Sequence, residues 1–376
     1  MIFSKQTKEM VYQTDASQII GKVGKVIIPK SINEIQNAVI KNSRIIPRGG
    51  GTGLVGGSVP NEGLVIDMSK MNKILHFEER RKKIEVEAGI ILDELNDFLD
   101  KYGLEFPVKP SSHEVCSIGG MIATDAVGSR AIKYGRTSKW VEWVDVVNWQ
   151  GKIERKEKAE LSDFTSLEGI TGLIIRAGLK LENQAKRTAS LIGRDNLDEI
   201  VNLTKELRMS PEVSMIEFFD KKVSALLGWE KKYHLLIEYE SGRGEIRGRE
   251  YEEIMNLRDK VYPLLAEKGY SRIEDPRIFL DKFEELMFWL ETNKIPVFGH
   301  LGVGILHPCF SREQEKKIIH LIRLVKKLRG QITGEHGIGL LKRDFLDRTE
   351  KKLYESVKKR NDPRNKFNPE KIISSP

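Results

Sequence analysis

Residues 47–60 read PRGGGTGLVGGSVP, and this glycine-rich stretch decides how the rest of the chain is interpreted. Six of the nine residues 49–57 are glycine, and short apolar runs flank the stretch at 45–46 and 64–66. A backbone without Cβ atoms can approach a ligand closely and adopt positive φ. Successive exposed N–H groups in such a loop form a concavity that binds anions. The stretch therefore predicts a loop that holds a phosphate-bearing cofactor.

Two other interpretations of this stretch fit less well. Residues 51–56 match the Rossmann pattern G-x-G-x-x-G, but that pattern requires the last glycine to open a helix. Ser58 and Pro60 follow instead, which favours a turn or an extended segment. A flexible linker would be polar and would separate domains, whereas strand-like apolar runs adjoin this stretch on both sides. We therefore expect a ligand-binding loop.

The composition describes a globular chain with room for more than one domain. The 376 residues are 39% hydrophobic and 31% charged. The net charge is +8, but basic and acidic residues are interleaved and aromatic residues are not interspersed for base stacking. We therefore expect no nucleic-acid partner.

The chain also lacks targeting signals and cofactor-ligating cysteines. No apolar run approaches the roughly 20 residues of a spanning helix, and the first residues lack a signal-peptide core. This favours a cytoplasmic protein, with at most peripheral attraction to the inner face of an anionic membrane. Cys116 and Cys309 are too few to hold an iron–sulfur cluster. A redox enzyme of this composition would need a separate electron acceptor.

Short strands and amphipathic helices mix along the chain, which predicts an α+β fold. Ser31 and Glu34 have the spacing of a capping box that opens a helix, and residues 83–88 alternate as a half-buried strand does. Residues 107–135 are rich in glycine, serine and proline and are expected to form loops. Further strands are expected at 26–28, 141–149, 172–181 and 233–238, and further helices at 92–99, 196–207, 245–268 and 278–293.

Three of the seven histidines lie between positions 300 and 336. His300 and His307 stand at the ends of an expected strand–turn–strand, and Glu335 precedes His336 in a glycine-rich frame. Neutral imidazole is the commonest metal ligand, so His300, His307 and Glu335 could hold one metal ion with an open position for substrate. His336 would then be a free base. The spacing alone leaves two packed core histidines with a surface Glu-His pair as an equal alternative.

Taken in order, these segments resemble the FAD-binding flavoproteins of the PCMH-type, or vanillyl-alcohol-oxidase, superfamily. The most similar branch contains the D-2-hydroxyacid dehydrogenases, among them D-lactate and D-2-hydroxyglutarate dehydrogenases and the glycolate oxidase D-subunit. The resemblance spans almost the whole chain. The segments that carry it are 47–54 (PRGGGTGL), 117–120 (SIGG) with Tyr134-Gly135, 167–172 (LEGITG), 334–339 (GEHGIG), and Asp362-Pro363 with Asn368-Pro369.

The resemblance implies three parts of the chain. An FAD-binding domain of two α+β subdomains would cover 1–185, an α+β substrate (cap) domain 186–310, and a C-terminal segment returning to the flavin 311–376. It also implies non-covalent FAD, because Thr52 stands where covalent relatives carry histidine. The implied cofactor-binding residues are Pro47, Arg48, Gly49, Gly50, Gly51, Thr52, Gly53, Leu54, Gly57, Ser58, Pro110, Ser111, Ser117, Gly119, Gly120, Ala123, Thr124, Gly128, Tyr134, Gly135, Glu168, Gly169, Gly172, Ile174 and Asn368.

The resemblance also assigns roles near the C-terminus. His300, His307 and Glu335 would bind a divalent metal, Zn or Mn, that holds the substrate's hydroxyl and carboxylate. His336 would take the hydroxyl proton while the α-hydride passes to flavin N5. Arg258 stands where relatives use an arginine for the substrate carboxylate, and Arg272 is a less securely aligned second candidate.

The chain departs from the branch inside the two-histidine motif. The branch writes Gly-His-x-Gly-Asp-Gly-Asn-Leu-His, whereas Val303 replaces the aspartate and Ile305 the asparagine. Cys309 stands where an asparagine is often found. Losses of this kind around a metal site typically reduce affinity or activity about 10–100-fold, so the substrate could be atypical or the metal weakly held. Cys116, near a position of covalent flavin attachment in some relatives, is expected to be a buried apolar cysteine.

We therefore expect FAD-dependent oxidation of a D-2-hydroxy acid, of the D-lactate, glycolate or D-2-hydroxyglutarate type, to the 2-oxo acid. The expected partners are that small molecule and a separate electron acceptor: a quinone, an electron-transfer flavoprotein, an iron–sulfur subunit or oxygen. One alternative is a non-catalytic FAD-binding subunit of a larger glycolate-oxidase-like complex. Another keeps the fold for a sugar-nucleotide or alcohol oxidase, which would need no carboxylate-binding arginine.

Overall fold

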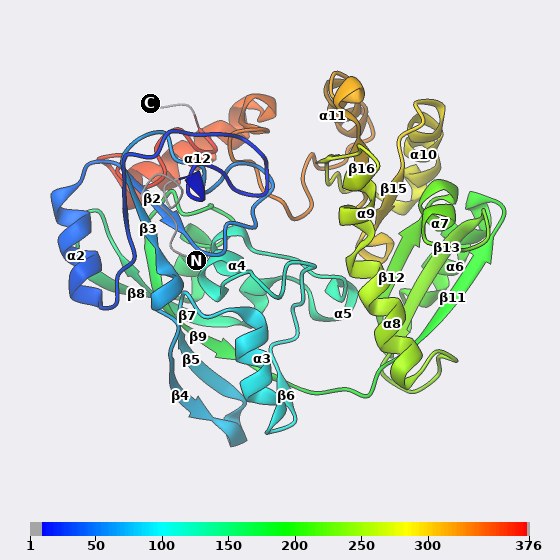
Figure 1. Ribbon diagram of the computed structural model, residues 1–376, viewed down its shortest axis with the longest axis horizontal. Coiled ribbons are helices and arrows are strands. Elements are labelled where there is room, and N and C mark those ends of the chain that lie inside the picture. Colours follow the sequence, from blue (N-terminus) through cyan, green and yellow to red (C-terminus); the bar gives the residue numbers. More distant parts are fainter. Residues whose placement is uncertain (1–9, 374–376) are drawn as a thin grey trace. The chain divides into compact units, whose positions relative to one another are not determined.

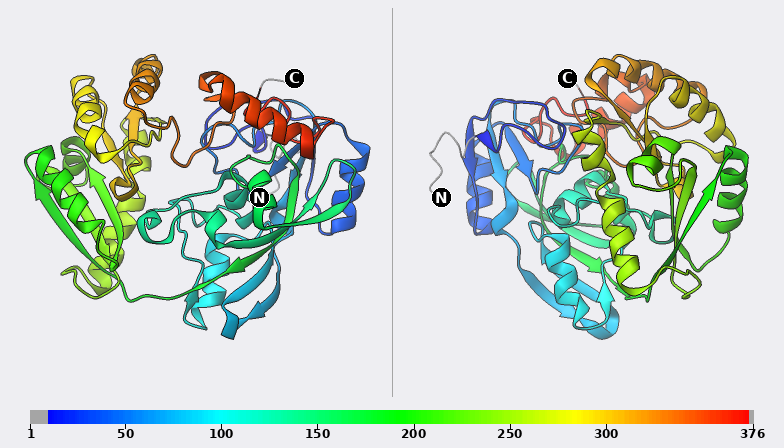
Figure 2. Two further views of the ribbon diagram at one scale, coloured as in Figure 1. Left: turned by 180° about the vertical axis from the view of Figure 1, so that it is seen from behind. Right: turned by 45° about the vertical axis from the view of Figure 1, so that its right-hand side comes forward.

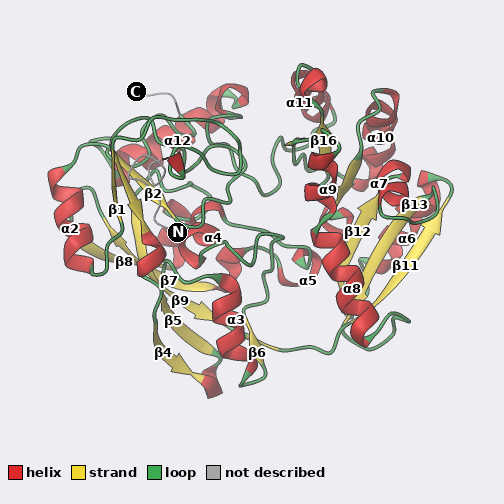
Figure 3. Cartoon of the chain, viewed as in Figure 1, coloured by secondary structure: helices red, strands yellow, loops and turns green. Residues whose placement is uncertain are grey.

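The computed structural model describes residues 10–373, and its contacts divide the chain into two units. The first unit comprises Met1–Ala126, Arg136–Gln184 and His336–Pro376, and the second comprises Val127–Gly135 and Ala185–Glu335. Figures 1 and 2 show the chain coloured by sequence. Helices and strands are mixed in both units, which confirms the α+β class (Figure 3). The boundaries differ from those expected, because 127–135 and 311–335 belong to the second unit.

The glycine stretch of the first unit joins two strands of a small parallel sheet. The strands β1 (Lys25–Ile27), β3 (Leu64–Asp67) and β2 (Ile45–Arg48) lie in that order. The helix α2 (Ile32–Lys41) precedes β2, and the Ser31 side chain caps it by accepting from the backbone N–H of Glu34, as the sequence predicts. A strand and not a helix follows the stretch, which confirms that it is not a Rossmann turn.

A five-stranded antiparallel sheet forms the larger part of the first unit. Its order is β4 (Ile74–Glu78), β5 (Lys83–Glu87), β9 (Leu173–Lys180), β7 (Val141–Val147) and β8 (Ile153–Glu157). Ile84 and Val86 alternate into the core, as the period-two pattern predicts. Helix α3 (Leu92–Asp100) packs Leu92, Leu95 and Leu99 on this core. A two-stranded sheet pairs β6 (Leu104–Glu105) with β10 (Glu182–Asn183).

Part of the expected loop at 107–135 is helical. Helix α4 (Ile118–Thr124) begins after Ser117, whose side chain accepts from the Gly120 N–H. A Cβ on Gly119 would lie 2.7 Å from the Cβ of Ala88. The glycine therefore lets the helix pack closely on the end of β5, so it serves packing within the protein.

The part of the chain that follows Glu335 belongs to the first unit. After α12 (Arg348–Asn361), Phe367 forms a parallel bridge with Ile45 of β2. The backbone N–H of Asn368 donates to the Ile45 carbonyl at 2.8 Å. Residues from the two ends of the sequence thus share one sheet edge beside the glycine stretch.

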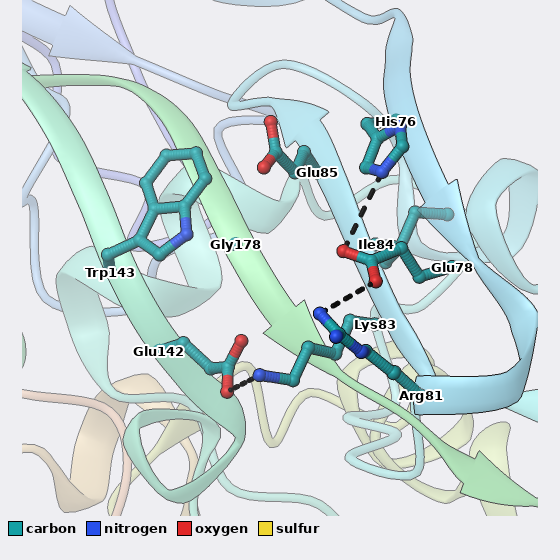
Figure 4. Close-up of a pocket in the computed structure, with 9 residues that line it drawn as sticks. All are labelled: His76, Glu78, Arg81, Lys83, Ile84, Glu85, Glu142, Trp143 and Gly178. Atoms are coloured by element: carbon teal, nitrogen blue, oxygen red, sulfur yellow. Dashed lines mark ion pairs between the residues drawn. The ribbon is translucent and has the colours of Figure 1, made fainter.

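The exposed face of the five-stranded sheet carries a polar pocket of about 200 Å³ (Figure 4). The Lys83 ammonium pairs with Glu142 at 2.7 Å, and Arg81 pairs with Glu78 at 3.3 Å. The Trp143 indole crosses over Gly178, where a Cβ would lie 2.2 Å from the indole nitrogen. Its basic groups are paired with neighbouring carboxylates. We therefore interpret this pocket as part of the solvated surface of the sheet and not as a binding site.

The second unit is built on a six-stranded antiparallel sheet. Its order is β11 (Thr188–Arg194), β13 (Tyr233–Tyr239), β12 (Val213–Phe219), β15 (Val297–Gly299), β16 (His307–Phe310) and β14 (Arg272–Ile273). Its helices are α5 (Ala131–Tyr134), α6 (Leu197–Leu207), α7 (Lys221–Leu226), α8 (Gly248–Asp259), α9 (Val261–Glu267), α10 (Phe283–Thr292) and α11 (Lys317–Lys327).

The two faces of this sheet carry different side chains. Ile216 and Phe218 of β12 join the apolar core with Phe283 of α10. Because side chains alternate along a strand, Glu217 faces the other way, where α8 covers the sheet. Figure 1 shows α8 on one side of β11–β13 and α6 and α10 on the other.

The expected helix at 245–268 is two helices, α8 and α9. Pro263 lacks an N–H, and a proline ring clashes with the carbonyl four residues earlier, which here belongs to Asp259. Helix α8 therefore ends at Asp259. Among residues 10–373, no helix is both long and apolar enough to cross a membrane.

Candidate functional site

Two neighbouring strands bring the two histidines of the second unit together. In the antiparallel pairing of β15 with β16, Phe298 is opposite His307. His300 comes directly after β15, and its ring centroid lies 5.0 Å from that of His307, edge to face. Both residues are buried. The strand–turn–strand arrangement that the sequence predicts is confirmed, with a short 3-10 turn (Leu301–Val303) between the strands.

Glu335 reaches the same place on a loop that Asp275 holds. Oδ2 of Asp275 accepts hydrogen bonds from the Thr333 hydroxyl at 2.8 Å and the Gly334 N–H at 2.9 Å. It also accepts from the Glu335 N–H at 2.7 Å. The side chain of Asp275 follows β14 and is fully buried. One carboxylate oxygen therefore fixes three consecutive residues of the loop.

The three side chains offer metal-ligand atoms within 4.8 Å of one another. Glu335 Oε1 lies 3.1 Å from His307 Nε2 and 3.4 Å from His300 Nε2. Two imidazole nitrogens and one carboxylate oxygen form a donor set that suits Zn or Mn and leaves positions open. The structure thus brings the three side chains expected as metal ligands together.

Glu217 contacts the Nδ1 atom of His300, and Arg258 in turn contacts Glu217. Oε1 of Glu217 lies 2.5 Å from His300 Nδ1, and Oε2 accepts from Arg258 Nε at 2.9 Å. Burial opposes ionisation of Glu217, but Arg258 and His300 outweigh it and hold its pKa at about 2. Burial likewise opposes the charge on His300, yet the neighbouring carboxylates Glu217 and Glu335 raise the pKa of His300 to about 9.

The two arginines expected near a substrate carboxylate are both engaged within the protein. Arg258 is 3% exposed and pairs with Glu217 at 2.8 Å and with Asp259 at 2.7 Å. Arg272, on β14, pairs with Glu274 at 3.3 Å. The Arg258 guanidinium forms a buried ion pair with Glu217, a residue that the sequence analysis did not single out.

The segments expected to bind the flavin converge within the first unit. The Asn368 side chain donates to the Gly57 carbonyl at 3.0 Å and to the Glu168 carbonyl at 2.7 Å. The Glu168 N–H donates to Ala123 at the end of α4 at 2.8 Å. Three glycine-containing segments and the C-terminal asparagine are thus joined. The expected residues in this unit are Pro47, Arg48, Gly49, Gly50, Gly51, Thr52, Gly53, Leu54, Gly57, Ser58, Pro110, Ser111, Ser117, Gly119, Gly120, Ala123, Thr124, Glu168, Gly169, Gly172, Ile174 and Asn368.

Different physical requirements explain the individual glycines of the 47–60 stretch. Gly51 adopts φ of +69°, where other residues are strained. A Cβ on Gly50 would lie 2.1 Å from the Val115 carbonyl oxygen, so this glycine allows close packing within the protein. Among residues 10–373, a Cβ at Gly53 would meet only Asp15, at 3.8 Å. Protein packing therefore does not require glycine at position 53, which fits a backbone that a cofactor approaches.

Glu168 is buried beside the loop that follows His336. Its Oε1 accepts from the N–H of Ile338 at 2.6 Å and of Gly339 at 3.1 Å. Burial is the main cause that raises the pKa of Glu168 to about 7. Its Oε2 is buried without a hydrogen-bond partner among the described residues. A buried polar atom of this kind near the glycine segments also fits a bound cofactor.

Some expected cofactor residues have other contacts. The N–H and hydroxyl of Ser58 donate to Asp15 at 3.2 and 3.3 Å, and Arg48 donates to the Thr14 carbonyl at 2.8 Å. Gly128, Tyr134 and Gly135 belong to the second unit, where the Tyr134 hydroxyl donates to Glu240 at 2.6 Å. These three residues therefore belong to a different unit from the other expected cofactor residues.

Two of the residues that depart from the branch pattern, Ile305 and Cys309, are buried in the protein. Ile305 is 2% exposed, and a Cβ on Gly334 would lie 2.6 Å from its side chain. Cys309 is fully buried, and burial raises the pKa of its thiol well above the usual value. Cys116 is also buried, as expected, with burial raising its pKa to about 12. Ile305 and Cys309 add apolar packing around the histidine strands, whereas Cys116 lies in the core of the first unit.

Two family models match the chain, one to each end. The FAD binding domain matches residues 24–156, and the C-terminal domain of FAD linked oxidases matches residues 272–372. The first contains the glycine stretch and α4. The second contains His300, His307, Glu335 and His336.

Curated relatives match over nearly their whole length. The chain is 29% identical to the glycolate oxidase subunit GlcD of Bacillus subtilis, over 97% of this chain and 92% of the relative. It is 28% identical to a D-lactate dehydrogenase of Archaeoglobus fulgidus and 25% identical to a D-2-hydroxyglutarate dehydrogenase of Stutzerimonas stutzeri, each over 93% of this chain and 91% of the relative.

A solved structure shows the same fold. An alkyldihydroxyacetonephosphate synthase superposes with a TM-score of 0.65 at 19% identity, covering 92% of this chain and 76% of the synthase chain. The two matching family models, the relatives and the shared fold point to the same family as the glycine segments and the Glu335-His336 motif do. The chain therefore belongs to the PCMH-type FAD-dependent oxidoreductases, on the branch that contains the D-2-hydroxyacid dehydrogenases.

Proposed function

We propose that this flavoprotein oxidises a D-2-hydroxy acid to the 2-oxo acid. The observation that carries the proposal is the set of ligand atoms from His300, His307 and Glu335 within 4.8 Å, followed at the next position by His336. The curated relatives act, by their names, on D-lactate, D-2-hydroxyglutarate or glycolate. A metal held by these three side chains would leave positions open for the hydroxyl and carboxylate oxygens of such an acid.

In this proposal the three side chains hold a divalent metal, and His336 acts as the base. When bound, FAD supplies the acceptor for the C2 hydride at N5, and a divalent metal supplies a Lewis acid that lowers the hydroxyl pKa. His336 takes the hydroxyl proton through an imidazole nitrogen as the C2–H bond breaks and the C=O bond forms. Two electrons leave the substrate with the hydride, and a separate acceptor later removes them.

Asp275 and the glycine frame would set the geometry of this step. By fixing the backbone of residues 333–335, Asp275 sets the position of Glu335 in this proposal. Holding a base and a bound substrate in register supplies much of the rate enhancement of such a step. His336 itself is half-buried, so its imidazole is partly shielded from water.

The proposal is tested by product analysis under anaerobic conditions. FAD-loaded protein with Zn²⁺ or Mn²⁺ is mixed with one equivalent of D-lactate, glycolate or D-2-hydroxyglutarate. We expect one 2-oxo acid to form in an amount equal to the enzyme-bound flavin. Formation of no 2-oxo acid from any of the three would contradict the proposal.

A second candidate is a non-catalytic FAD-binding subunit of a larger glycolate-oxidase-like complex. It is favoured by Val303 and Ile305, which replace polar residues of the branch beside the histidines. Elemental analysis separates the two functions. A catalytic subunit is expected to retain about one Zn or Mn per chain and to lose it in His307→Ala, whereas a non-catalytic subunit would contain no metal in either form.

A further inference from the structure

Glu217 is a charged residue at the centre of the second unit, and its position follows from the sheet. Phe218 pairs with Gly299 across β12 and β15, so one further step along this antiparallel register places Glu217 opposite His300. The Glu217 side chain is 0% exposed. A buried carboxylate is costly unless it is paired and hydrogen-bonded. The residues that pair with Glu217 therefore indicate its role in the protein.

The contact with Glu217 fixes the direction in which His300 presents its two nitrogens. Nδ1 lies 2.5 Å from Glu217 Oε1, and Nε2 lies on the side of Glu335, 3.4 Å from its Oε1. An ionised carboxylate only accepts hydrogen bonds, so Nδ1 must carry the hydrogen. In the neutral ring the lone pair then lies on Nε2, the nitrogen that points toward Glu335 and His307.

Arg258 keeps Glu217 in this position. Its Nε and one terminal nitrogen lie 2.9 and 2.8 Å from Glu217 Oε2, which leaves Oε1 for His300. A further terminal nitrogen donates to Asp259 at 2.7 Å. The planar guanidinium thus neutralises the carboxylate and holds its second oxygen away from the ring. Helix α8 supplies this arginine on the face that meets β12.

We propose that Glu217 and Arg258 are positioning residues for the metal site. Glu217 orients His300 and fixes its Nε2 as the metal-binding nitrogen, and Arg258 holds Glu217 so that it does not itself become a ligand. Hydrogen bonding of a ligating histidine to a carboxylate is a general way to set ring orientation and basicity. The pair supplies from β12 and α8 the polar support that Val303 and Ile305 cannot provide. The inference rests on the metal site of the proposed function.

Metal titration without substrate tests this inference separately from the chemistry. FAD-loaded full-length protein is freed of metal and titrated with Zn²⁺ and with Co²⁺ by calorimetry. Glu217→Ala is expected to weaken binding about 10–100-fold. Glu217→Gln keeps an oxygen that accepts from Nδ1, so we expect a smaller loss. The Co²⁺ absorption bands report ligand geometry and should change in Glu217→Ala.

The chain offers a matched control on the adjacent strand. Glu238 of β13 is equally buried and pairs with Arg130 at 2.8 Å, but no contact joins it to His300 in the described residues. Glu238→Gln should therefore bind Zn²⁺ and Co²⁺ as the unaltered protein does. If it weakens binding as much as Glu217→Ala, the effect is a general consequence of losing a buried charge and the inference fails.

A second variant covers the case in which an unpaired Arg258 prevents folding. The double change Glu217→Gln and Arg258→Met removes both charges, and exchanging a buried pair for uncharged groups is often tolerated. Circular dichroism and the thermal midpoint verify the fold. We expect the double variant to fold and to bind Zn²⁺ more weakly than the unaltered protein. Unaltered Zn²⁺ affinity in this variant would overturn the inference.

The single change Arg258→Met distinguishes positioning from direct substrate contact. If Arg258 positions Glu217, Zn²⁺ binding weakens in the absence of any substrate. If Arg258 instead binds the substrate carboxylate, Zn²⁺ affinity stays the same and only substrate affinity falls, which would contradict the inference and leave the proposed oxidation intact. Failure of the unaltered protein to bind Zn²⁺ or Co²⁺ would overturn both this inference and the metal part of the proposed function.

Discussion

The carboxylate of Asp275 accepts a hydrogen bond from the backbone N–H of Glu335, with 2.7 Å between oxygen and nitrogen. The same oxygen accepts from Gly334 and Thr333. Asp275, two positions beyond the strand β14, thus holds a loop about sixty positions later in the chain. The loop carries the only carboxylate of the proposed metal set, so its order should control metal binding.

Replacing Asp275 by alanine should therefore loosen the loop and weaken the metal site. The Glu335 N–H and the Thr333 hydroxyl would lose this acceptor, whereas the Gly334 N–H also donates to the Asp275 backbone carbonyl and would keep that bond. At roughly 1–3 kcal/mol for each lost bond, we expect the free energy of unfolding to fall by about 3 kcal/mol. Urea unfolding measures this change, and a Zn²⁺ titration should show weaker binding. Asp275→Asn keeps an acceptor oxygen and should lose much less. Equal stability and Zn²⁺ affinity in Asp275→Ala would contradict this role.

Two glycines of the 47–60 stretch should respond differently to alanine. Gly50→Ala places a Cβ against the Val115 carbonyl oxygen, so it should lower the thermal midpoint of the protein without FAD. Gly53→Ala meets no close protein atom and should leave that midpoint within a few degrees. We expect it instead to weaken FAD binding, measured by flavin fluorescence titration. Unchanged FAD affinity in Gly53→Ala would argue against cofactor approach at this residue.

The buried carboxyl of Glu168 should make stability depend on pH. Its pKa rises from the ordinary 4.5 to about 7 on folding, so between these pH values the folded state keeps a proton that the unfolded state has lost. Stability must then decrease as pH rises through this window, by about 3 kcal/mol in total. Glu168→Gln cannot ionise, and its unfolding free energy should lack this contribution.

The measurement is urea unfolding of both proteins at several pH values between 4.5 and 8. The difference between them isolates Glu168, because the other titrating groups are common to both. A stability difference that does not vary with pH would show that Glu168 is not protonated in the folded state near neutrality.

His336→Ala should bind FAD normally and reduce it slowly. Loss of a general base typically costs about 10²–10⁴-fold in rate, and stopped-flow single-turnover experiments measure it directly. Added imidazole should restore part of the rate. His320, exposed on α11, is a suitable control, and His320→Ala should reduce FAD at the normal rate. Normal reduction in His336→Ala would remove this residue from the mechanism.

Local patterns in the sequence predicted much of the secondary structure. The Ser31 cap, the alternation in β5 and the apolar periodicity of α3 act within a few residues, and the structure confirms each of them. The second half of the expected capping box differs, because the Glu34 side chain accepts from the Lys30 N–H. The break between α8 and α9 was also readable, because Pro263 excludes a continuous helix through Asp259. The helix α4 was not expected because its glycines looked like a loop, while their role is close packing on Ala88.

The parts of the site that the sequence analysis missed depend on distant partners. Glu217 is one acid within the apolar run of β12, and its partner His300 lies 83 positions later. Asp275 likewise acts on residues about sixty positions away. Nothing in the local sequence marks either residue, whereas His300, His307 and Glu335 stood out because histidines are few and glycines surround them. Arg258 stood out through the resemblance, because it stands where relatives use an arginine for the substrate carboxylate, but its buried partners became visible only in the fold.

The central claim is most directly tested by mixing FAD-loaded, metal-supplied protein with each enantiomer of lactate and of 2-hydroxyglutarate under anaerobic conditions. The absorption band of the oxidised flavin is followed by stopped flow. We predict that at least one D-acid bleaches the band in a single turnover and that its L-enantiomer does not. A flavin band that stays unchanged with both D-acids and with glycolate would contradict the assignment of this protein as a D-2-hydroxyacid dehydrogenase.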